Sequence, residues 1–350
     1  MNVKNMQHLT FREVDLKDVF FDSLKNDYPE FEEWFRNRPD KDAYVQYDDN
    51  GKIIGFLCLK MENYEVDDVT PSIIAKKILK ISTFKIDARG TRMGEQFVKI
   101  ITDYAVNEDV DVCYVTIFEK HEHLIRLVEK YGFDFYGIKE KNGKRENVYV
   151  KDMRKWYNDL DKDYPRINLE GKRKYMLSIY PAYHSIMFPD SILTTENKNI
   201  IKDVSYTNSI YKIYVCSMKD VDTLKQGDIL VLYRTADFGK SAEYSSVATS
   251  VCVVESVKKQ NEFNSFEEFY EYACKYSVFE KADLKKWYDK GSCVAIKMTY
   301  NMALKKRIVR HDLIEDIGID RDAYWGFLRL SDEQFWGIVE NGKINYNIFK

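Results

Sequence analysis

The spacing of apolar residues along the first part of the chain changes several times between the helical and the strand-like pattern. Residues 13–38 carry apolar side chains at helical spacing with acidic residues between them. Residues 43–62 alternate as a β-hairpin does, with Asp49-Asn50-Gly51 as its turn. The pattern then predicts a strand over 78–86, a helix over 94–106, a strand over 111–118, a helix over 121–131 and a closing hairpin over 133–153. This order predicts a mixed α/β domain over residues 1–153.

The pattern changes after this domain. Residues 154–173 are charged, contain a proline and lack clear periodicity, so we expect a linker there. From Lys174 onward the chain consists mainly of short β-rich runs, and only residues 265–279 and 281–291 show clear helical spacing. We therefore expect a second domain over 174–350, a small β-rich barrel with helical insertions and a C-terminal appendage.

Composition limits the class of protein. The chain has 350 residues, of which 45% are hydrophobic and 32% charged, which suits two globular domains. Neither a signal peptide nor an apolar run of about 18 residues appears, so we expect a cytoplasmic protein. The six cysteines form no CxxC pair, and His121-Glu122-His123 does not match the HExxH zinc motif. We expect reduced thiols and no metal site.

The charge of the chain is nearly balanced. Residues 1–150 hold 23 Lys and Arg against 28 Asp and Glu, a net charge of −5, and the remainder holds 31 against 29, a net charge of +2. This balance excludes a polybasic nucleic-acid-binding protein. Two local basic clusters, residues 171–175 and 304–310, could still contact phosphates, although ordinary solvated surface charge is the commoner explanation for such clusters.

A glycine-containing turn lies between the predicted strand 78–86 and the predicted helix 94–106. The segment Arg89-Gly-Thr-Arg-Met-Gly94 follows the strand with almost no polar spacer. Backbone N–H groups at a helix N-terminus form a seat for phosphate groups, and glycine lets the backbone approach a ligand closely. Arg89 and Arg92 add positive charge, so this turn is a candidate phosphate site.

These elements together resemble the GNAT superfamily of N-acetyltransferases over residues 8–153. The acetyl-CoA signature of that family, Gln/Arg-x-x-Gly-x-Gly/Ala, matches residues 89–94, and its closing "GF" motif matches Lys130-Tyr-Gly-Phe133. The resemblance implies that acetyl-CoA is bound, with its pyrophosphate on the turn and its pantetheine arm along the strand. The implied cofactor residues are Phe84, Lys85, Ile86, Arg89, Gly90, Thr91, Arg92, Met93, Gly94 and Glu95. The thioester would lie where the strands 78–86 and 111–118 separate.

The chain departs from the family pattern at two positions. Arg92 stands where the signature has its middle glycine, and Val128 stands where the family usually has a proton-donating tyrosine. Tyr131 lies three residues later, near the same helical face, and is either a substitute donor or a core aromatic residue. Glu65 is the candidate base among the four acids that precede the signature strand, which are otherwise solvated loop residues.

The second domain resembles the ASCH domains of the PUA-like superfamily over residues 174–300. The resemblance rests on the runs 175–188, 227–235 and 244–257. It implies an RNA-binding module, because PUA-like domains bind RNA or modified bases. Candidate RNA-binding residues are Tyr180, Tyr183, His184, Tyr233, Arg234, Lys305, Lys306 and Arg307.

Some ASCH proteins are amidohydrolases that act on an acetylated cytidine. They use a Gly-x-Lys-x-x-Thr/Glu-x-Arg segment just after the first helix. The matching stretch here, residues 188–199, lacks that register, because Glu196 and Lys198 stand in the opposite order. We therefore expect a binding module and not a hydrolase.

The sequence as a whole predicts an acetyl-CoA-dependent N-acetyltransferase whose PUA-like domain presents an RNA-type substrate, such as an amine on tRNA. A second reading keeps the acetyltransferase but gives it protein lysine or a small amine as acceptor. A third reading makes the chain an RNA-binding or regulatory protein that holds CoA without turnover, and Val128 supports it. A toxin role with a small antitoxin-like protein partner also fits an RNA-directed acetyltransferase.

Overall fold

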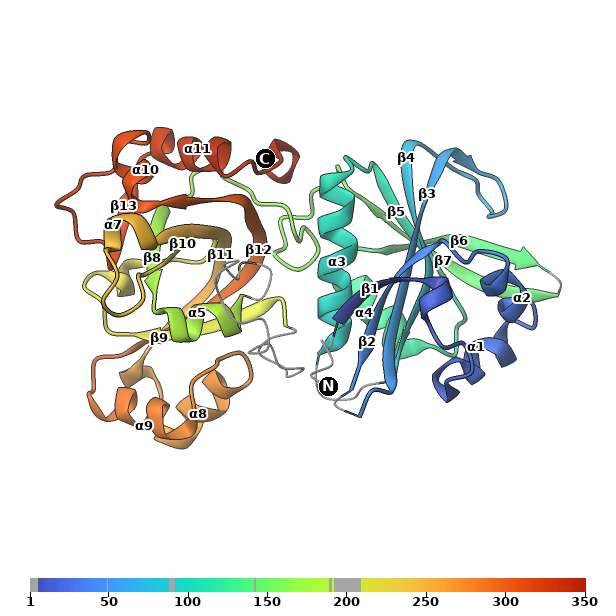
Figure 1. The fold of residues 1–350 in the computed structure, drawn as a ribbon, viewed down its shortest axis with the longest axis horizontal. Coiled ribbons are helices and arrows are strands. Elements are labelled where there is room, and N and C mark those ends of the chain that lie inside the picture. Colours follow the sequence, from blue (N-terminus) through green and yellow to red (C-terminus); the bar gives the residue numbers. More distant parts are fainter. Residues whose placement is uncertain (1–5, 49, 88–91, 142, 189–190, 192–208) are drawn as a thin grey trace. The chain divides into compact units, whose positions relative to one another are not determined.

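The computed structural model describes residues 6–48, 50–87, 92–141, 143–188, 191 and 209–350. The chain forms two compact units, Met1–Asp163 and Tyr164–Lys350 (Figure 1). The division falls inside the segment 154–173, so its first part packs with the first unit and its second part with the second unit. None of the described helices is both long enough and apolar enough to span a lipid bilayer.

The first unit is built on a seven-stranded sheet in the order β1-β2-β3-β4-β5-β7-β6. The strands are β1 (Met6–Thr10), β2 (Asp42–Tyr47), β3 (Ile53–Val66), β4 (Ile73–Ile86), β5 (Val112–Ile117), β6 (Asp134–Lys141) and β7 (Lys144–Asp152). Its α-helices are α1 (Asp22–Asp27), α2 (Phe31–Arg36), α3 (Met93–Asn107) and α4 (Glu122–Lys130). Helices α3 and α4 cover one face of the sheet, and α1 and α2 lie against the other (Figure 1).

The segment predicted as helical over 13–38 is broken in the structure. The 3-10 turn η1 (Phe11–Glu13) ends where the segment begins, and within it lie the 3-10 turn η2 (Val19–Phe21) and the two six-residue helices α1 and α2. Tyr28 ends α1 in an extended conformation, with φ −130° and ψ 92°. The next residue is Pro29, which disfavours a helical conformation in the residue before it, so one continuous helix cannot form.

The sheet opens between β4 and β5, which form the one parallel pair among its described strands. These two strands pair only from Ile78 with Val112 to Ile81 with Val115. Beyond that point β4 continues along β3, while β5 continues along β7. The β3–β4 register also skips Ser82, which is therefore the extra residue of a β-bulge at the opening. A bulge bends its strand and often marks a functional site.

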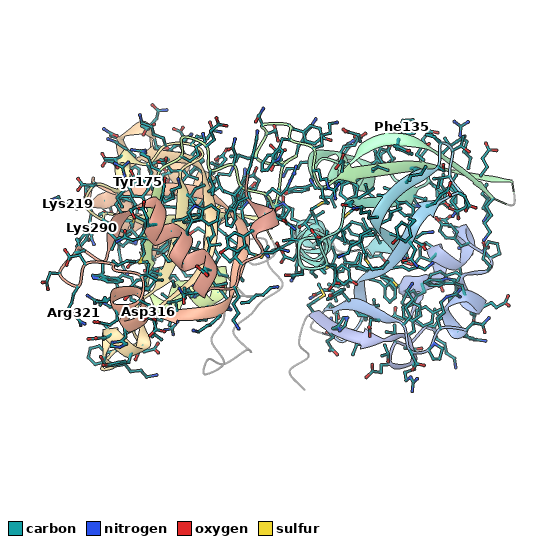
Figure 2. The ribbon with its side chains drawn as sticks, turned by 90° about the horizontal axis from the view of Figure 1, so that it is seen from above. Phe135, Tyr175, Lys219, Lys290, Asp316 and Arg321 are labelled. Atoms are coloured by element: carbon teal, nitrogen blue, oxygen red, sulfur yellow. The ribbon has the colours of Figure 1, made fainter. Side chains whose placement is uncertain are left out.

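At the far edge of this sheet lies β6. Phe135 on this strand is 58% exposed and points to the surface of the unit (Figure 2). The β6–β7 register shifts between Phe135 and Gly137. A Cβ atom at Gly137 would lie 2.1 Å from the carbonyl oxygen of Thr70, so only glycine allows the chain to pass there.

The second unit contains a six-stranded sheet in the order β13-β8-β10-β11-β12-β9. The strands are β8 (Lys174–Ile179), β9 (Tyr211–Cys216), β10 (Ile229–Arg234), β11 (Val247–Lys259), β12 (Val294–Val309) and β13 (Phe327–Leu330). The α-helices are α5 (Pro181–Met187), α7 (Ala242–Ser245), α8 (Phe266–Cys274), α9 (Lys281–Asp289), α10 (Arg310–Glu315) and α11 (Asp332–Asn341). The β-rich character and both predicted helical regions are present.

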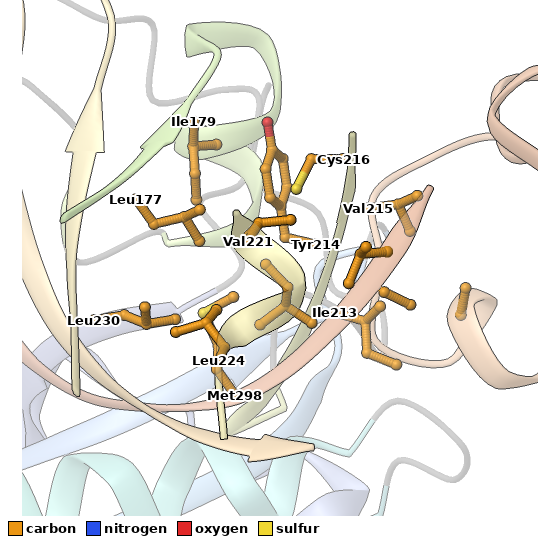
Figure 3. Close-up of a cluster of buried hydrophobic side chains, with 14 of the residues drawn as sticks. Leu177, Ile179, Ile213, Tyr214, Val215, Cys216, Val221, Leu224, Leu230 and Met298 are labelled. Carbon is orange, nitrogen blue, oxygen red and sulfur yellow. The ribbon is translucent and has the colours of Figure 1, made fainter. Parts of the chain in front are cut away.

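The sheet of the second unit is open among the described residues, where the sequence predicted a barrel. Its edge strands β13 and β9 have one partner each, and no described pairing joins them. Strand β12 is also longer than the apolar run at 293–300 suggested, because it continues through the basic cluster to Val309. Buried side chains such as Leu177, Ile213 and Leu230 pack into the core of this unit (Figure 3).

Candidate active site

A pocket of about 450 Å³ lies at the opening between β4 and β5. One wall consists of Lys80–Phe84 of β4 and Val115–Phe118 at the end of β5. The segment from Leu24 to Trp34, which joins α1 to α2, forms the opposite wall, and β6 and β7 contribute polar side chains. This volume suits a small molecule or the reacting end of a larger one.

Glu146 on β7 is the carboxylate held most firmly in this pocket. Its side chain is buried, and its Oε1 atom accepts a hydrogen bond from the Thr116 hydroxyl at 3.1 Å and another from the Tyr28 hydroxyl. No described group forms a hydrogen bond or an ion pair with Oε2, although Glu146 lines the pocket. The geometry therefore leaves one carboxylate oxygen for a bound ligand, while two hydroxyl groups fix the other.

The Tyr28 phenol remains protonated in this arrangement. Burial raises its pKa above the ordinary range, and the negative charge of Glu146 raises it further. A neutral phenol can only donate to the carboxylate. Hydrogen bonds to a charged group contribute about 1.5–3 kcal/mol each, so this contact holds both side chains in place. The Tyr28 ring also packs against Phe118, with 5.2 Å between ring centroids.

A second polar cluster lies at the mouth of the pocket. His121 Nε2 lies 3.2 Å from Asp27 Oδ2, and Lys120 forms an ion pair with the same carboxylate. Lys144 donates a hydrogen bond to the backbone carbonyl of Asp27. These contacts tie the end of α1 to the start of α4 and to β7, which fixes the wall that carries Tyr28.

The predicted pantetheine edge lies beside the pocket. Phe84, Lys85 and Ile86 pair with β3 on one side, and the last pairing with β5 is at Ile81. The other edge of β4 therefore has no strand partner over 82–86 among the described residues. Such an edge can bind an extended chain through main-chain hydrogen bonds. The Lys85 side chain turns away, forming a 3.3 Å ion pair with Asp87 and a hydrogen bond to the Phe20 carbonyl.

The glycine-containing turn is described only in its second half. Arg89, Gly90 and Thr91 lie outside the described residues. Arg92 precedes α3 with φ 56° and ψ 27°, a left-handed conformation that favours glycine and costs other residues about 1–2 kcal/mol. This geometry gives a physical reason for a glycine at the middle position of the signature. Arg92 Nη1 lies 3.7 Å from Glu95 Oε1, so the guanidinium is near the first turn of α3.

Helix α3 places the rest of the turn. Met93 and Glu95 are buried, and Glu95 also pairs with Lys130 of α4 at 3.4 Å. A Cβ atom at Gly94 would lie 2.6 Å from Leu127 Cδ2, so glycine lets the start of α3 pack closely on α4. The first N–H groups of a helix have no intrahelical acceptor and can bind an anion.

Comparison with known proteins identifies this unit. Residues 8–133 match the model of the acetyltransferase (GNAT) family. This part of the chain is a GNAT acetyltransferase domain. The chain is accordingly an acyltransferase that uses acetyl-CoA. No curated protein sequence matches the chain.

Solved structures similar to the chain fall into two groups. A GNAT acetyltransferase from Elizabethkingia anophelis with acetyl-CoA bound is 16% identical, covers 42% of this chain and 98% of its own, and gives a TM-score of 0.30. The IAA acetyltransferase of Bacillus cereus is 12% identical over 42% of this chain and 97% of its own, with a TM-score of 0.31. An ASCH protein from Zymomonas mobilis is 7% identical over 48% of this chain and 94% of its own, with a TM-score of 0.33. These likenesses are distant.

The two catalytic residues proposed from the sequence of the GNAT domain lie outside the pocket. Tyr131 follows α4 with its side chain fully buried, and its hydroxyl accepts a hydrogen bond from Lys130 at 3.1 Å. Glu65 lies near the far end of β3, opposite Ile74. Neither residue is among those that line the pocket. Val128 is buried in the core, with 1% of its surface exposed.

Sequence reasoning missed Glu146. One signal was present, because Glu146, Val148 and Val150 alternate along a strand and therefore share one face. A lone carboxylate in such a row is normally a surface residue at the strand end. Only the pairing of β5 with β7, which brings Thr116 close to Glu146, shows that it faces the pocket.

The predicted RNA-binding residues of the second unit differ in how far their side chains are exposed to solvent. Tyr180 is 62% exposed, and Tyr183 packs on Phe279 with 4.4 Å between ring centroids. His184, Tyr233 and Arg234 are buried, so their side chains offer no open stacking surface. The second group lies on the end of β12, where Lys305 and Lys306 are exposed and Arg307 donates to the carbonyl of Leu304. Glu196 and Lys198 lie outside the described residues.

Proposed function

We propose that the GNAT domain transfers the acetyl group of acetyl-CoA to an amine that enters the pocket between β4 and β5, with Glu146 accepting the proton of the amine. The observation that carries this proposal is the position of Glu146 at the opening, where Tyr28 and Thr116 hold one carboxylate oxygen and the other is available. An amine must lose a proton as it forms an amide, and a buried, oriented carboxylate can take it.

The residues that would hold acetyl-CoA fit its shape. The free edge of β4 over 82–86 suits an extended arm, and the start of α3, with Met93, Gly94 and Glu95, suits the pyrophosphate. We propose that the complete turn, Arg89 to Glu95, forms this seat. Bound acetyl-CoA would supply the acetyl thioester, and the thiol that departs would carry one proton in place of the proton that the amine gives up, so the transfer balances.

The protein has three tasks in this reaction. Glu146 Oε2 accepts the proton that the amine nitrogen loses as its bond to the acetyl carbon forms and the carbon–sulfur bond breaks. Tyr28 and Thr116 keep the carboxylate aimed at the opening. The aromatic wall of Tyr28, Phe31 and Trp34 limits access of water to the reacting groups.

Replacing Glu146 tests the proposal. Glu146→Gln keeps the size and the hydrogen-bonding oxygen but cannot take a proton, so kcat/KM for amine acetylation should fall about 100-fold or more. The Kd for acetyl-CoA, measured by calorimetry, should not change. Glu140→Gln on the neighbouring strand β6 is the matched control, because Glu140 is exposed and does not line the pocket. Equal activity of the two variants would remove Glu146 from the mechanism.

For the acceptor, we propose an RNA-type amine, such as an aminoacyl group or a base amine of tRNA, acetylated in the cytoplasm. The support is the ASCH-like sequence pattern of residues 174–300, which suggests an RNA-binding domain joined to the GNAT domain. The exposed pair Lys305 and Lys306 on β12 supplies charge for phosphate contacts. Protein lysine and small amines are the competing acceptors.

The RNA contact is tested separately from catalysis. Lys305→Gln combined with Lys306→Gln should weaken RNA binding and reduce the slope of log K against log salt by about 1 to 2, since each phosphate contact contributes about 0.7–0.9 to it. Lys285→Gln with Lys286→Gln, two exposed lysines on α9, removes the same charge elsewhere on the unit. An identical salt slope in wild type and both double variants would exclude this end of β12 from the RNA contact.

A further inference from the structure

Four lysines line the pocket that is proposed to receive the acceptor amine, and the proposed reaction uses none of them. Lys80 on β4, Lys139 and Lys141 on β6 and Lys144 on β7 all line the cavity. Strand pairing explains why they share one face. Lys80 stands opposite Tyr114, whose strand also carries Thr116, and Lys139 stands opposite Glu146. Lys141 stands opposite Lys144 two positions further along.

The lysines differ in which negative or polar group contacts each ammonium. Lys139 is buried and forms an ion pair with Asp68, and Lys144 donates to the Asp27 carbonyl. Lys80 forms no ion pair within the described residues, and its ammonium lies 5.5 Å from the centre of the Tyr114 ring. Lys80 is therefore a partly buried cation, and a second cation, Lys139, lies close to it.

The electrostatics around Lys80 show that positive charge is in excess there. Burial lowers the pKa of Lys80, and the charge of Lys139 lowers it further, against the opposing pull of Asp68 and Glu62. Lys60 on β3 adds to the lowering. Burial alone would raise the pKa of Asp68, but its hydrogen bond to Lys139 and the nearby lysine charges lower it. Asp68 is therefore a charged carboxylate next to three lysines, Lys139, Lys80 and Lys141.

Partly buried positive charge of this kind is costly unless an anion offsets it. A solvated protein surface would not need such an anion, but these side chains line a cavity of about 450 Å³. Glu146 stands opposite Lys139 on the same face, yet no ion pair joins it to any of the four lysines among the described residues. The lining holds these four lysines against the three acids Asp27, Glu30 and Glu146, so its charge points to an anionic group on the ligand.

We propose that Lys80, Lys139, Lys141 and Lys144 form an anion subsite of the acceptor pocket, so that the acceptor is an amine that also carries a phosphate or carboxylate group. This inference rests on the proposed function for the amine, which lies at Glu146. The lysine wall holds the anionic group and thereby orients the amine. A phosphate-bearing acceptor also agrees with an RNA-type substrate.

Three small amines that differ only in the second group test the subsite. They are O-phosphoethanolamine, β-alanine and ethanolamine, which carry a phosphate, a carboxylate and a neutral hydroxyl. Binding to the full chain is measured by NMR titration, and acetylation is measured in parallel. We expect at least one anionic amine to bind about tenfold or more tightly than ethanolamine, since a charge-assisted hydrogen bond contributes about 1.5–3 kcal/mol. The tighter of the two anionic amines identifies the group that the subsite prefers.

Single-lysine variants assign the effect to the wall. Lys80→Met keeps the apolar stem and should abolish most of the preference, about a tenfold change, while ethanolamine binding stays the same. Lys76→Met removes an exposed lysine from the same strand outside the pocket and should change nothing. Lys141→Met is a second test at an exposed position where folding is not at risk. A melting temperature for each variant verifies the fold.

The outcomes separate the subsite from the proposed function. Retained preference for the anionic amine without any acetylation would support the subsite and contradict acetylation of small amines by this domain. Equal binding of all three amines, or an unchanged preference in both Lys80→Met and Lys141→Met, would overturn the subsite even if acetylation proceeds.

Discussion

What a side chain near the pocket can contact depends on the direction in which it points. Glu146 and Glu140 lie on paired strands of one hairpin, but only Glu146 lines the pocket and bonds to Tyr28 and Thr116. Tyr131 illustrates the converse case. From the sequence it is either a substitute proton donor or a core aromatic residue, and in the structure it packs inside the core next to Lys130. Chemical type alone therefore does not show which residues line the pocket.

Removing the Tyr131 hydroxyl should affect stability and not turnover. Tyr131→Phe deletes a buried group that accepts a hydrogen bond from Lys130 at 3.1 Å, so we expect a loss of about 0.5–1.5 kcal/mol in unfolding free energy. The kcat of amine acetylation should stay within about twofold of wild type. Urea unfolding and steady-state kinetics measure the two effects. A large fall in kcat at unchanged stability would return Tyr131 to the list of proton donors.

At the scale of elements, the site depends on where β4 and β5 part and on how α3 begins. The strands share four paired positions, and the bulge at Ser82 coincides with their separation. Helix α3 begins directly beyond β4 after the glycine-containing turn, with Gly94 packed on Leu127. The free strand edge and the helix N-terminus are thus adjacent, which is what a ligand with an extended arm and a pyrophosphate requires.

A bulky residue at the start of α3 should block the cofactor. In Gly94→Trp the new side chain meets Leu127 and covers the first turn of the helix, so acetyl-CoA affinity should fall by about 100-fold or more. Leu127 Cδ2 is the end of a flexible side chain, so the fold should survive. Calorimetric titration with acetyl-CoA measures the loss, and circular dichroism verifies the helix content. Wild-type affinity in a folded variant would contradict the assignment of this turn.

The sequence predicted local elements better than their assembly. The strands and helices predicted over 78–131 are present in the structure, and their bounds agree within a few residues except that β4 starts earlier, at Ile73. The agreement arises because the spacing of apolar residues reflects which side chains are buried. Pro29 was visible in the sequence, yet the helical spacing around it suggested one helical region. The open sheet of the second unit and the role of Glu146 depend on strand pairing between distant segments, which no local pattern encodes.

At the scale of the whole molecule, the two units differ in how they use polar groups. The GNAT domain exposes its carboxylate and lysines to a pocket. The second unit buries His184, whose Nε2 lies 2.8 Å from the Thr249 hydroxyl. Burial lowers the pKa of His184 to about 3, and the charges of Arg234 and Arg307 contribute. Such a group makes the stability of the unit depend on pH.

The sign of that dependence follows from proton binding. Between pH of about 6.5 and about 3 the unfolded chain protonates His184 and the folded unit does not, so stability falls as the pH is lowered through this window. The contribution of His184 should reach about 1.4 kcal/mol per pH unit well below pH 6.5. His184→Gln should flatten the decline of the unfolding midpoint between pH 7 and pH 5. His123→Gln, at an exposed position, is the control, and equal slopes in the two variants would contradict the buried, neutral state of His184.

We propose amine acetylation at the pocket that contains Glu146, with RNA as the acceptor. The most direct measurement incubates wild type and Glu146→Gln with radiolabelled acetyl-CoA and total cytosolic RNA, with a matched protein fraction in parallel. We expect label in RNA from the wild type and almost none from Glu146→Gln. Label confined to protein would contradict the RNA acceptor. Absence of label from every fraction, with acetyl-CoA still bound by the wild type, would contradict acetyl transfer at this pocket.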